Sequence, residues 1–158
     1  MKYLFIILKH KWFFIIAGRK FGVNWLSCIL HDWTKFLPIE FKEYKQWFTG
    51  SKKNEEKFAI AWLHHQNSNP HHWEYWVLRS NHSKNIKSYD NNALPMPEWA
   101  IREMVADWFA ASRAYNGKWP DLDNFNWLNE NRSKMIMHHS NQNIINKVLK
   151  EWEENKNE

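Results

Sequence analysis

The chain has 158 residues, enough for one domain with its own core, so two or more large domains are excluded. Charged residues make up 25% and apolar residues 44% of the sequence, which excludes disorder over most of its length. The formal net charge is +5, and its placement is more informative than its size.

The counts of glycine, proline and cysteine narrow the fold class. There are only 4 Gly and 5 Pro, whereas an all-β sandwich needs a turn roughly every 8 to 12 residues. The single cysteine, Cys28, cannot form an internal disulfide, so nothing indicates a secreted disulfide framework. We therefore expect one all-α domain over residues 1–158, located in the cytoplasm.

The positive charge is concentrated at the start of the chain. Residues 1–20 contain five basic residues and no acidic one, whereas the remainder is balanced. A local excess of this kind indicates an anionic substrate, a membrane surface or only a solvated helix face, and we expect no stable complex with nucleic acid. Lys9-His10-Lys11 interrupts the apolar run, so neither a signal peptide nor a membrane-spanning helix fits. A helix lying in the membrane interface stays open.

The predicted elements, in chain order, are joined by short breaks at glycine, proline and asparagine. The periodicity predicts helices over 3–20, 24–32, 39–48 and 53–66, a short helix over 71–79, a polar loop over 80–95, the longest helix over 97–116, a short element near 124–138 and a last helix near 141–154. The total is about six or seven helices, with the C-terminal helices within 124–154.

Histidine is unusually frequent for a chain of this size. The nine residues are His10, His31, His64, His65, His71, His72, His82, His138 and His139. Imidazole and carboxylate together are ligands for Zn, Mn, Fe and similar ions. Because these residues are spread over several predicted helices, they can converge only in the core of a helical bundle.

The adjacent pair His31-Asp32 is the sharpest local signal. Neighbouring residues on a helix are about 100° apart, so both side chains can reach one ion only near a helix end or a kink. The pair closes an apolar run and is followed by Trp33-Thr34-Lys35. The simpler alternative is an aspartate that caps the next turn beside a surface histidine.

Two segments of the chain, one of which contains His31-Asp32, resemble motifs of a known superfamily. Ile29 to Phe36 resembles the "LLHDxxK" segment of the HD-domain metal-dependent phosphohydrolases, and Met104 to Arg113 is similar to their "vaDxxdAxxxR" segment. His10 looks like the first histidine of the superfamily, and the pairs at 64–65 and 71–72 stand where its middle histidines occur. The resemblance covers residues 10–115. Within the superfamily, the chain looks like a phage and Gram-positive bacterial family of unassigned function.

The resemblance implies roles for individual residues. It implies that the principal metal is bound by His10, His31, Asp32 and Asp107. His64 would be an auxiliary histidine near the reacting group or a ligand to a second metal, with His65, His71 and His72 as weaker candidates. Lys35 would contact an anionic substrate oxygen. The cofactor would be one or two divalent transition metal ions: Mn, Fe, Co, Zn or Ni.

Helical spacing, without the resemblance, also supports Asp107 as a residue of the site. Glu103 and Asp107 share a face with small residues, which is unusual for two acids unless they meet a cation or a histidine. The alternative for Asp107 is a surface ion pair with Arg102 or Arg113. His64 and His65 each align with apolar residues of the 53–66 helix, so which of them faces inward stays open.

The sequence gives weaker evidence for a functional role of the remaining polar residues. Glu74 and Arg79 are candidates for lining the pocket around the metal. The only argument for them is that they lie close in sequence to His71-His72. For His82, His138 and His139 we expect structural roles.

The leading functional expectation is metal-dependent hydrolysis of a phosphoester on a nucleotide or another small phosphorylated molecule. Two alternatives stay open: a di-iron oxygenase of the HD type, and a non-enzymatic protein that keeps a metal for binding. The sequence does not indicate the oligomeric state.

Overall fold

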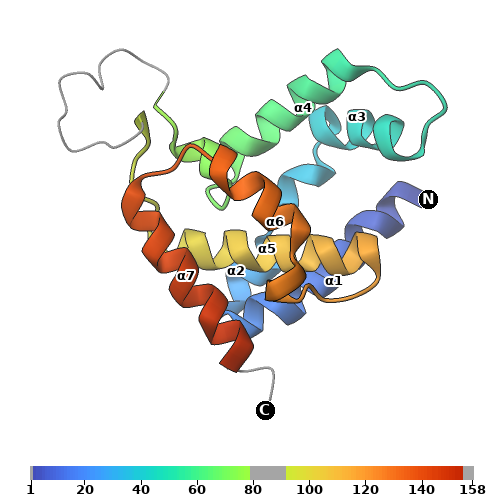
Figure 1. The fold of residues 1–158 in the computed structure, drawn as a ribbon. Helices are drawn as coiled ribbons and strands as arrows, with labels where there is room; N and C mark the ends of the chain where they lie inside the picture. The colour runs from blue at the N-terminus through green and yellow to red at the C-terminus, as the bar shows by residue number, and fades with distance from the viewer. Residues whose placement is uncertain (1, 79–91, 155–158) are drawn as a thin grey trace.

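The computed structural model describes residues 2–78 and 92–154, and its regular elements in these ranges are helices (Figure 1). Its α-helices are α1 (Lys2–Lys20), α2 (Trp25–Leu30), α3 (Pro38–Thr49), α4 (Glu55–Ser68), α5 (Glu98–Asn116), α6 (Asn126–Asn131) and α7 (His139–Glu154). In the described ranges the only β-type pairing is a single bridge between Val77 and Ala93. The expected all-α fold with six or seven helices is confirmed.

Helices α1 and α5 form the centre of the molecule, and their pairing is the most extensive in the fold. The buried residues of α1 recur every three or four positions, from Ile7 and His10 to Phe14 and Ala17, so one stripe of the helix faces inward. Helix α5 is buried on several sides because α7 also packs against it. The main core therefore surrounds α5, with Phe109 fully buried in it.

Gly18 allows α2 to lie close against α1. A Cβ atom at position 18 would lie 3.0 Å from the Sγ atom of Cys28, which is fully buried. Asn24 caps α2 by accepting a hydrogen bond from the backbone N–H of Ser27. This approach fixes the end of α2, and therefore His31, beside the middle of α1.

Helices α3 and α4 pack on each other at the N-terminal end of α1 (Figure 1). Pro38 opens α3, and Asn54 caps α4 by accepting a hydrogen bond from the backbone N–H of Lys57. Tyr44 and Ala61 join Tyr3 and Ile7 in a second, smaller core cluster. This pair of helices closes one side of the space in which the histidines gather.

Three predicted elements differ from the structure. The helix expected over 24–32 ends at Leu30, since Asp32 has a left-handed backbone (φ 57°) that no α-helix continues through. The helix expected over 71–79 is only a 3₁₀ turn, Trp73–Trp76, after the break at Pro70. The element expected near 124–138 is α6 followed by a 3₁₀ turn, Arg132–Lys134.

Of the polar loop expected over 80–95, residues 80–91 lie outside the described ranges, and 92–95 contain no α-helix. Among the helices that the structure describes, none combines the length and the hydropathy needed to cross a membrane.

Candidate metal centre

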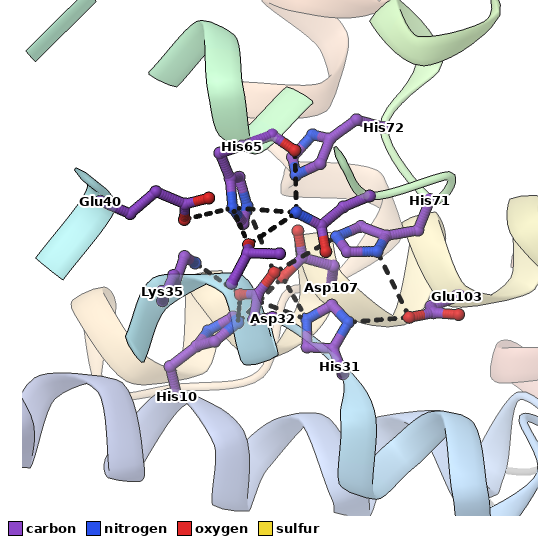
Figure 2. A network of polar contacts seen from close by, with 12 residues as sticks. His10, His31, Asp32, Lys35, Glu40, His65, His71, His72, Glu103 and Asp107 are labelled. Atoms are coloured by element: carbon purple, nitrogen blue, oxygen red, sulfur yellow. Dashed lines mark hydrogen bonds and ion pairs between the residues drawn. The ribbon is translucent and has the colours of Figure 1, made fainter. Parts of the chain in front are cut away.

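Four of the predicted ligands meet between α1, the corner after α2, and α5 (Figure 2). The Nε2 atom of His10 lies 3.0 Å from Oδ1 of Asp107 and 3.4 Å from Oδ2 of Asp32. The Nε2 atom of His31 lies 3.4 Å from the same Asp107 oxygen. These four residues form the first ligand group, which has two imidazoles and two carboxylates.

A second ligand group shares Asp32. Its other members are His65 at the inner face of α4 and His71 and His72 in the segment that follows α4. The Oδ1 atom of Asp32 lies 3.2 Å from Nε2 of His65 and 3.4 Å from Nε2 of His71. Within each group, the candidate ligand atoms all lie within 4.8 Å of one another.

The backbone at Asp32 explains how adjacent residues serve one site. His31 caps the end of α2, and Asp32 takes up its left-handed conformation before the 3₁₀ turn Trp33–Phe36 begins. Aspartate tolerates this region better than most residues do, at some cost in strain. The turn removes the helical offset between positions 31 and 32, so both side chains point into the same space.

Three inner histidines are oriented by carboxylates on their outer side. The Nδ1 atom of His31 lies 3.0 Å and that of His71 3.3 Å from Oε1 of Glu103. The Nδ1 atom of His65 lies 2.9 Å from Oε2 of Glu40. When Nδ1–H donates to a carboxylate, the Nε2 atom carries the lone pair, and here each Nε2 faces Asp32 or Asp107. Imidazoles that bind metals are usually held in this way.

Several buried atoms in the centre make no hydrogen bond of good geometry. Five of them are Nε2 of His10, His31, His71 and His72, and Oδ1 of Asp32, and Nδ1 of His10 also lacks a hydrogen-bond partner. Buried polar atoms are nearly always satisfied, and a group of five that share one space requires an explanation. A cation bound by these lone pairs would satisfy them, so the residues present fit a metal site of nitrogen and oxygen ligands.

Opposite charges in the centre shift the pKa values of its aspartates, His71 and Lys35 toward the charged forms. Burial works against the ionised carboxylates, but His10 and His31 hold the pKa of Asp107 well below its usual range. In the same way, His31 and Lys35 hold the pKa of Asp32 well below its usual range. Burial opposes the charged form of His71 as well, yet the nearby carboxylates of Asp32 and Glu103 raise its pKa to about 10. Both carboxylates are therefore ionised at neutral pH and ready to bind a cation.

Lys35 lies at the edge of the centre, where its ammonium group is ion-paired with Oδ2 of Asp32. Burial lowers the pKa of a lysine, but the nearby charges of Asp32 and Asp107 outweigh burial and raise the pKa of Lys35. A permanently charged ammonium group thus stands beside the first ligand group.

A cavity of about 530 Å³ opens directly onto the centre. His10, His65, His71 and Asp107 form its polar floor, with Lys35 beside them. The walls are rich in aromatic side chains, supplied by Trp62, Trp73, Trp108, Tyr115, Phe125 and Trp127. The volume suits a small organic molecule with an anionic end and a flat apolar end.

The structure separates the two members of the pair at 64–65. His65 is buried and faces Asp32, whereas His64 is partly exposed and lies outside both ligand groups. The Nδ1 atom of His64 lies 2.7 Å from Oε1 of Glu40, whose other oxygen contacts His65. His64 therefore contacts the centre only through Glu40.

The structure also decides between the alternatives for Asp107. Arg102 is bonded to Glu98 and Glu151, and Arg113 lies over the ring of Phe13. The surface ion pair considered for Asp107 is wrong, because its carboxylate points to His10 and His31 instead.

The other candidates from the sequence lie as follows. Glu103 lies on the outer side of the centre, and Glu74 lines the cavity. His138 hydrogen-bonds with Ser140 and contacts the ring of His139, and neither histidine belongs to a ligand group. Arg79 and His82 lie outside the described residues.

Sequence reasoning missed three polar residues of the site. Glu40 is fully buried in α3, and the side-chain amide of Asn69 donates to the Thr34 hydroxyl beside His65. Glu40 lies four residues before Tyr44 and so on the buried stripe of its helix, a spacing that marks it only once the inward face of the helix is known. Thr34 and Asn69 lie in turns, where no periodicity marks an inward side chain.

Comparison with known proteins adds a family but no activity. No curated protein and no solved structure matches the chain significantly. A family model described as a family of unknown function, DUF5662, matches residues 1–151, and the chain belongs to that family.

Proposed function

We propose that the protein is a metal-dependent phosphohydrolase of the HD type, acting on a nucleotide or another small phosphorylated molecule. The observation that carries the proposal is the position of Asp32. Its two oxygens face two different ligand groups, and Lys35 stands beside it at the floor of a cavity of about 530 Å³. Carboxylates shared between two ions are suited to displacement at phosphorus.

The first ligand group would hold one divalent cation through His10, His31, Asp32 and Asp107, and the second group would hold another through His65, His71 and His72 together with Asp32. Bound there, divalent cations would lower the pKa of water and polarise a phosphoryl oxygen.

Lys35 would bind the anionic end of the substrate. Its ammonium group lines the cavity and keeps its charge, because Asp32 and Asp107 raise its pKa. A fixed positive charge beside a phosphoryl group stabilises the additional negative charge that develops on the oxygens during transfer.

The cavity walls would position the remainder of the substrate. Trp62, Trp108 and Trp127 line the cavity with flat apolar rings, and Trp62 packs against His65 of the second ligand group. Such rings stack well on a nucleobase or another aromatic ring. Polar groups at the same wall, including Asn116 and Asn131, could recognise the edge of that ring.

Glu74 would supply the proton that the leaving oxygen requires. It lines the cavity, and burial raises the pKa of its carboxyl group. One of its oxygens accepts a hydrogen bond of 2.7 Å from the amide of Gln66, which orients the group. A carboxyl group with a raised pKa is a suitable general acid.

The test uses the full chain, loaded separately with Mn²⁺, Co²⁺ or Zn²⁺ and incubated without oxygen with a panel of nucleoside monophosphates, diphosphates and triphosphates and small sugar phosphates. We expect release of phosphate or of a nucleoside with at least one class, and its loss in Asp107→Asn. Turnover that is unchanged in Asp107→Asn would contradict the proposal, as would the absence of turnover on every class with every ion.

A di-iron oxygenase is the second candidate, because the second ligand group offers three imidazoles beside one carboxylate. Ligand sets of imidazole and carboxylate also bind iron. The two candidates differ in their need for oxygen. Activity that requires iron, consumes oxygen and is silent with Zn²⁺ would favour the oxygenase.

A further inference from the structure

Helices α1 and α2, together with the start of the 3₁₀ turn Trp33–Phe36, expose large apolar side chains on the side away from the core. Eight of these residues have 50% to 69% of their surface exposed, and they are Phe5, Leu8, Trp12, Trp25, Leu26, Ile29, Leu30 and Trp33. We call these eight residues the α1–α2 surface. Single exposed apolar residues are ordinary, but so many large ones on two packed helices indicate a binding surface.

The charge around this surface has one sign. Residues 2–31 contain five basic residues, Lys2, Lys9, Lys11, Arg19 and Lys20, and no acidic residue. All except Lys11 are exposed, and the guanidinium group of Arg19 lies 4.8 Å from the ring centroid of Trp25. The next acid in the chain, Asp32, is buried in the metal centre.

The nearest acids at the Gly22 end do not cancel this charge. Glu98 and Glu151 are both ion-paired with Arg102, which in turn donates a hydrogen bond to the backbone carbonyl of Phe21. The surface therefore combines apolar side chains with a rim of exposed basic residues.

We propose that the α1–α2 surface binds an anionic lipid membrane, with α1 lying in the plane of the interface. Helices that bind in this way present tryptophan, phenylalanine and leucine toward the acyl chains and basic residues toward the headgroups. Trp12, Trp25 and Trp33 have the amphipathic rings that favour the headgroup level. The basic rim supplies the attraction to anionic headgroups.

Charge argues against a second copy of the chain as the occupant. A two-fold contact through this surface would place the same basic rim against itself, and residues 2–31 contain no acid to pair with it. An anionic membrane removes that repulsion and buries the same apolar side chains.

The α1–α2 surface is separate from the candidate metal centre. None of its eight residues lines the cavity, and α1 turns His10 to its opposite, buried face. Membrane binding can therefore be measured without any assumption about the reaction.

The experiment is co-sedimentation of the full chain with two kinds of vesicle, phosphatidylcholine alone and phosphatidylcholine mixed with phosphatidylserine. We expect the wild type to pellet with the mixed vesicles, and less so as salt is raised. The double variant Leu8→Gln/Trp12→Gln should lower the partition coefficient by about a hundredfold, since two apolar side chains no longer insert. The charge variant Lys2→Gln/Lys20→Gln should lower it by about tenfold.

Matched controls separate the surface from general effects. Ile60→Gln/Leu63→Gln removes two exposed apolar side chains of α4, and Lys52→Gln/Lys57→Gln removes two exposed lysines elsewhere. Both controls should bind mixed vesicles as the wild type does, and circular dichroism should show that every variant is folded.

Three results would overturn the proposal: no binding of the wild type to mixed vesicles, equal binding of Leu8→Gln/Trp12→Gln, or equal loss in the controls. A wild-type oligomer that Leu8→Gln/Trp12→Gln converts to a monomer would assign the surface to a second copy instead. Loss of vesicle binding should leave any phosphoester hydrolysis in solution unchanged, since none of the eight residues lines the cavity, so the two proposals fail independently.

Discussion

Asp32 faces His65 with one carboxylate oxygen, Oδ1, at 3.2 Å, and presents its other oxygen, Oδ2, to His10 at 3.4 Å. One side chain therefore belongs to two ligand groups that come from different helices. Each oxygen has its own set of imidazole neighbours, so the two groups depend on a single residue.

Replacing Asp32 by asparagine should remove metal from both groups. Asparagine has the same shape and also tolerates the left-handed backbone, but an amide is a far poorer ligand than a carboxylate. The affinity should fall by more than the roughly 100-fold that changes outside the ligand set produce. Metal analysis of the reconstituted protein checks this, and a variant that retains the metal content of the wild type would contradict it.

Replacing Glu103 by glutamine should weaken metal binding without abolishing it. Glu103 orients His31 and His71 through their Nδ1 atoms, and a neutral acceptor holds them less firmly. We expect a loss of about 10- to 100-fold in affinity for Mn²⁺. Titration calorimetry measures it, with the exposed Glu56→Gln as the matched control. An unchanged affinity in Glu103→Gln would show that the carboxylate has no orienting role.

Replacing Lys35 by glutamine should impair turnover while the metal stays bound. The ammonium group of Lys35 lines the cavity, and no candidate ligand atom is lost with it. On a phosphorylated substrate we expect kcat/KM to fall by about 100-fold. Steady-state kinetics, together with metal analysis, tests this against Lys42→Gln, an exposed lysine of α3. Equal kinetics in both variants would remove Lys35 from the reaction.

Metal binding should release a proton at pH 7. Asp32 and Glu103 raise the pKa of His71 to about 10, so this imidazole is protonated at neutral pH until a cation displaces the proton. Below about pH 10 the proton competes with the metal, so the apparent affinity should decrease as the pH falls. Calorimetry in buffers with different ionisation enthalpies measures the proton count.

The control for this experiment is His138→Asn, a histidine outside both ligand groups, which should behave as the wild type does. Binding enthalpies that are independent of the buffer would contradict the assignment of the proton to the centre.

Replacing Gly18 by valine should destabilise the fold. Even a Cβ atom there would lie 3.0 Å from the Sγ atom of buried Cys28, so valine would force α1 and α2 apart. Overpacking of this kind costs about 1 to 3 kcal/mol. Urea unfolding checks the value, and metal affinity should fall in the same variant, because α2 carries His31. A stability equal to that of the wild type would mean that α2 can shift at no cost.

The sequence indicated the first ligand group and named His65, His71, His72 and Glu103 as further candidates, but it did not indicate Glu40, Thr34 or Asn69. His31, Asp32 and Asp107 carried a recognisable pattern, and the structure brings them together with His10. The resemblance ranked His64 above His65, and that order is wrong, because His65 faces Asp32 whereas His64 lies outside the ligand groups. Helical spacing alone left the pair open, since about 100° of rotation separates neighbours and both align with apolar residues. The kink at Asp32 depends on its φ angle, which no periodicity reveals.

Glu40 could not be predicted from the sequence for a different reason. An acid in the first turn of a predicted helix is ordinarily exposed and favourable for the helix dipole. Its burial depends on α4 packing across it and supplying His64 and His65, which is a tertiary contact. Residues of this kind can be found from sequence only when the helix phase is known precisely.

The ligands of the centre come from α1, the corner after α2, the segment around α4 and the middle of α5, so residues distant in sequence must meet before any group is complete. Local helix formation is fast, whereas contacts between distant segments form late and require loops to close. His10 and Asp107 reach each other only once α1 and α5 have paired. An ion would therefore find no complete set of ligands in the unfolded chain, and its full binding energy would favour the native state.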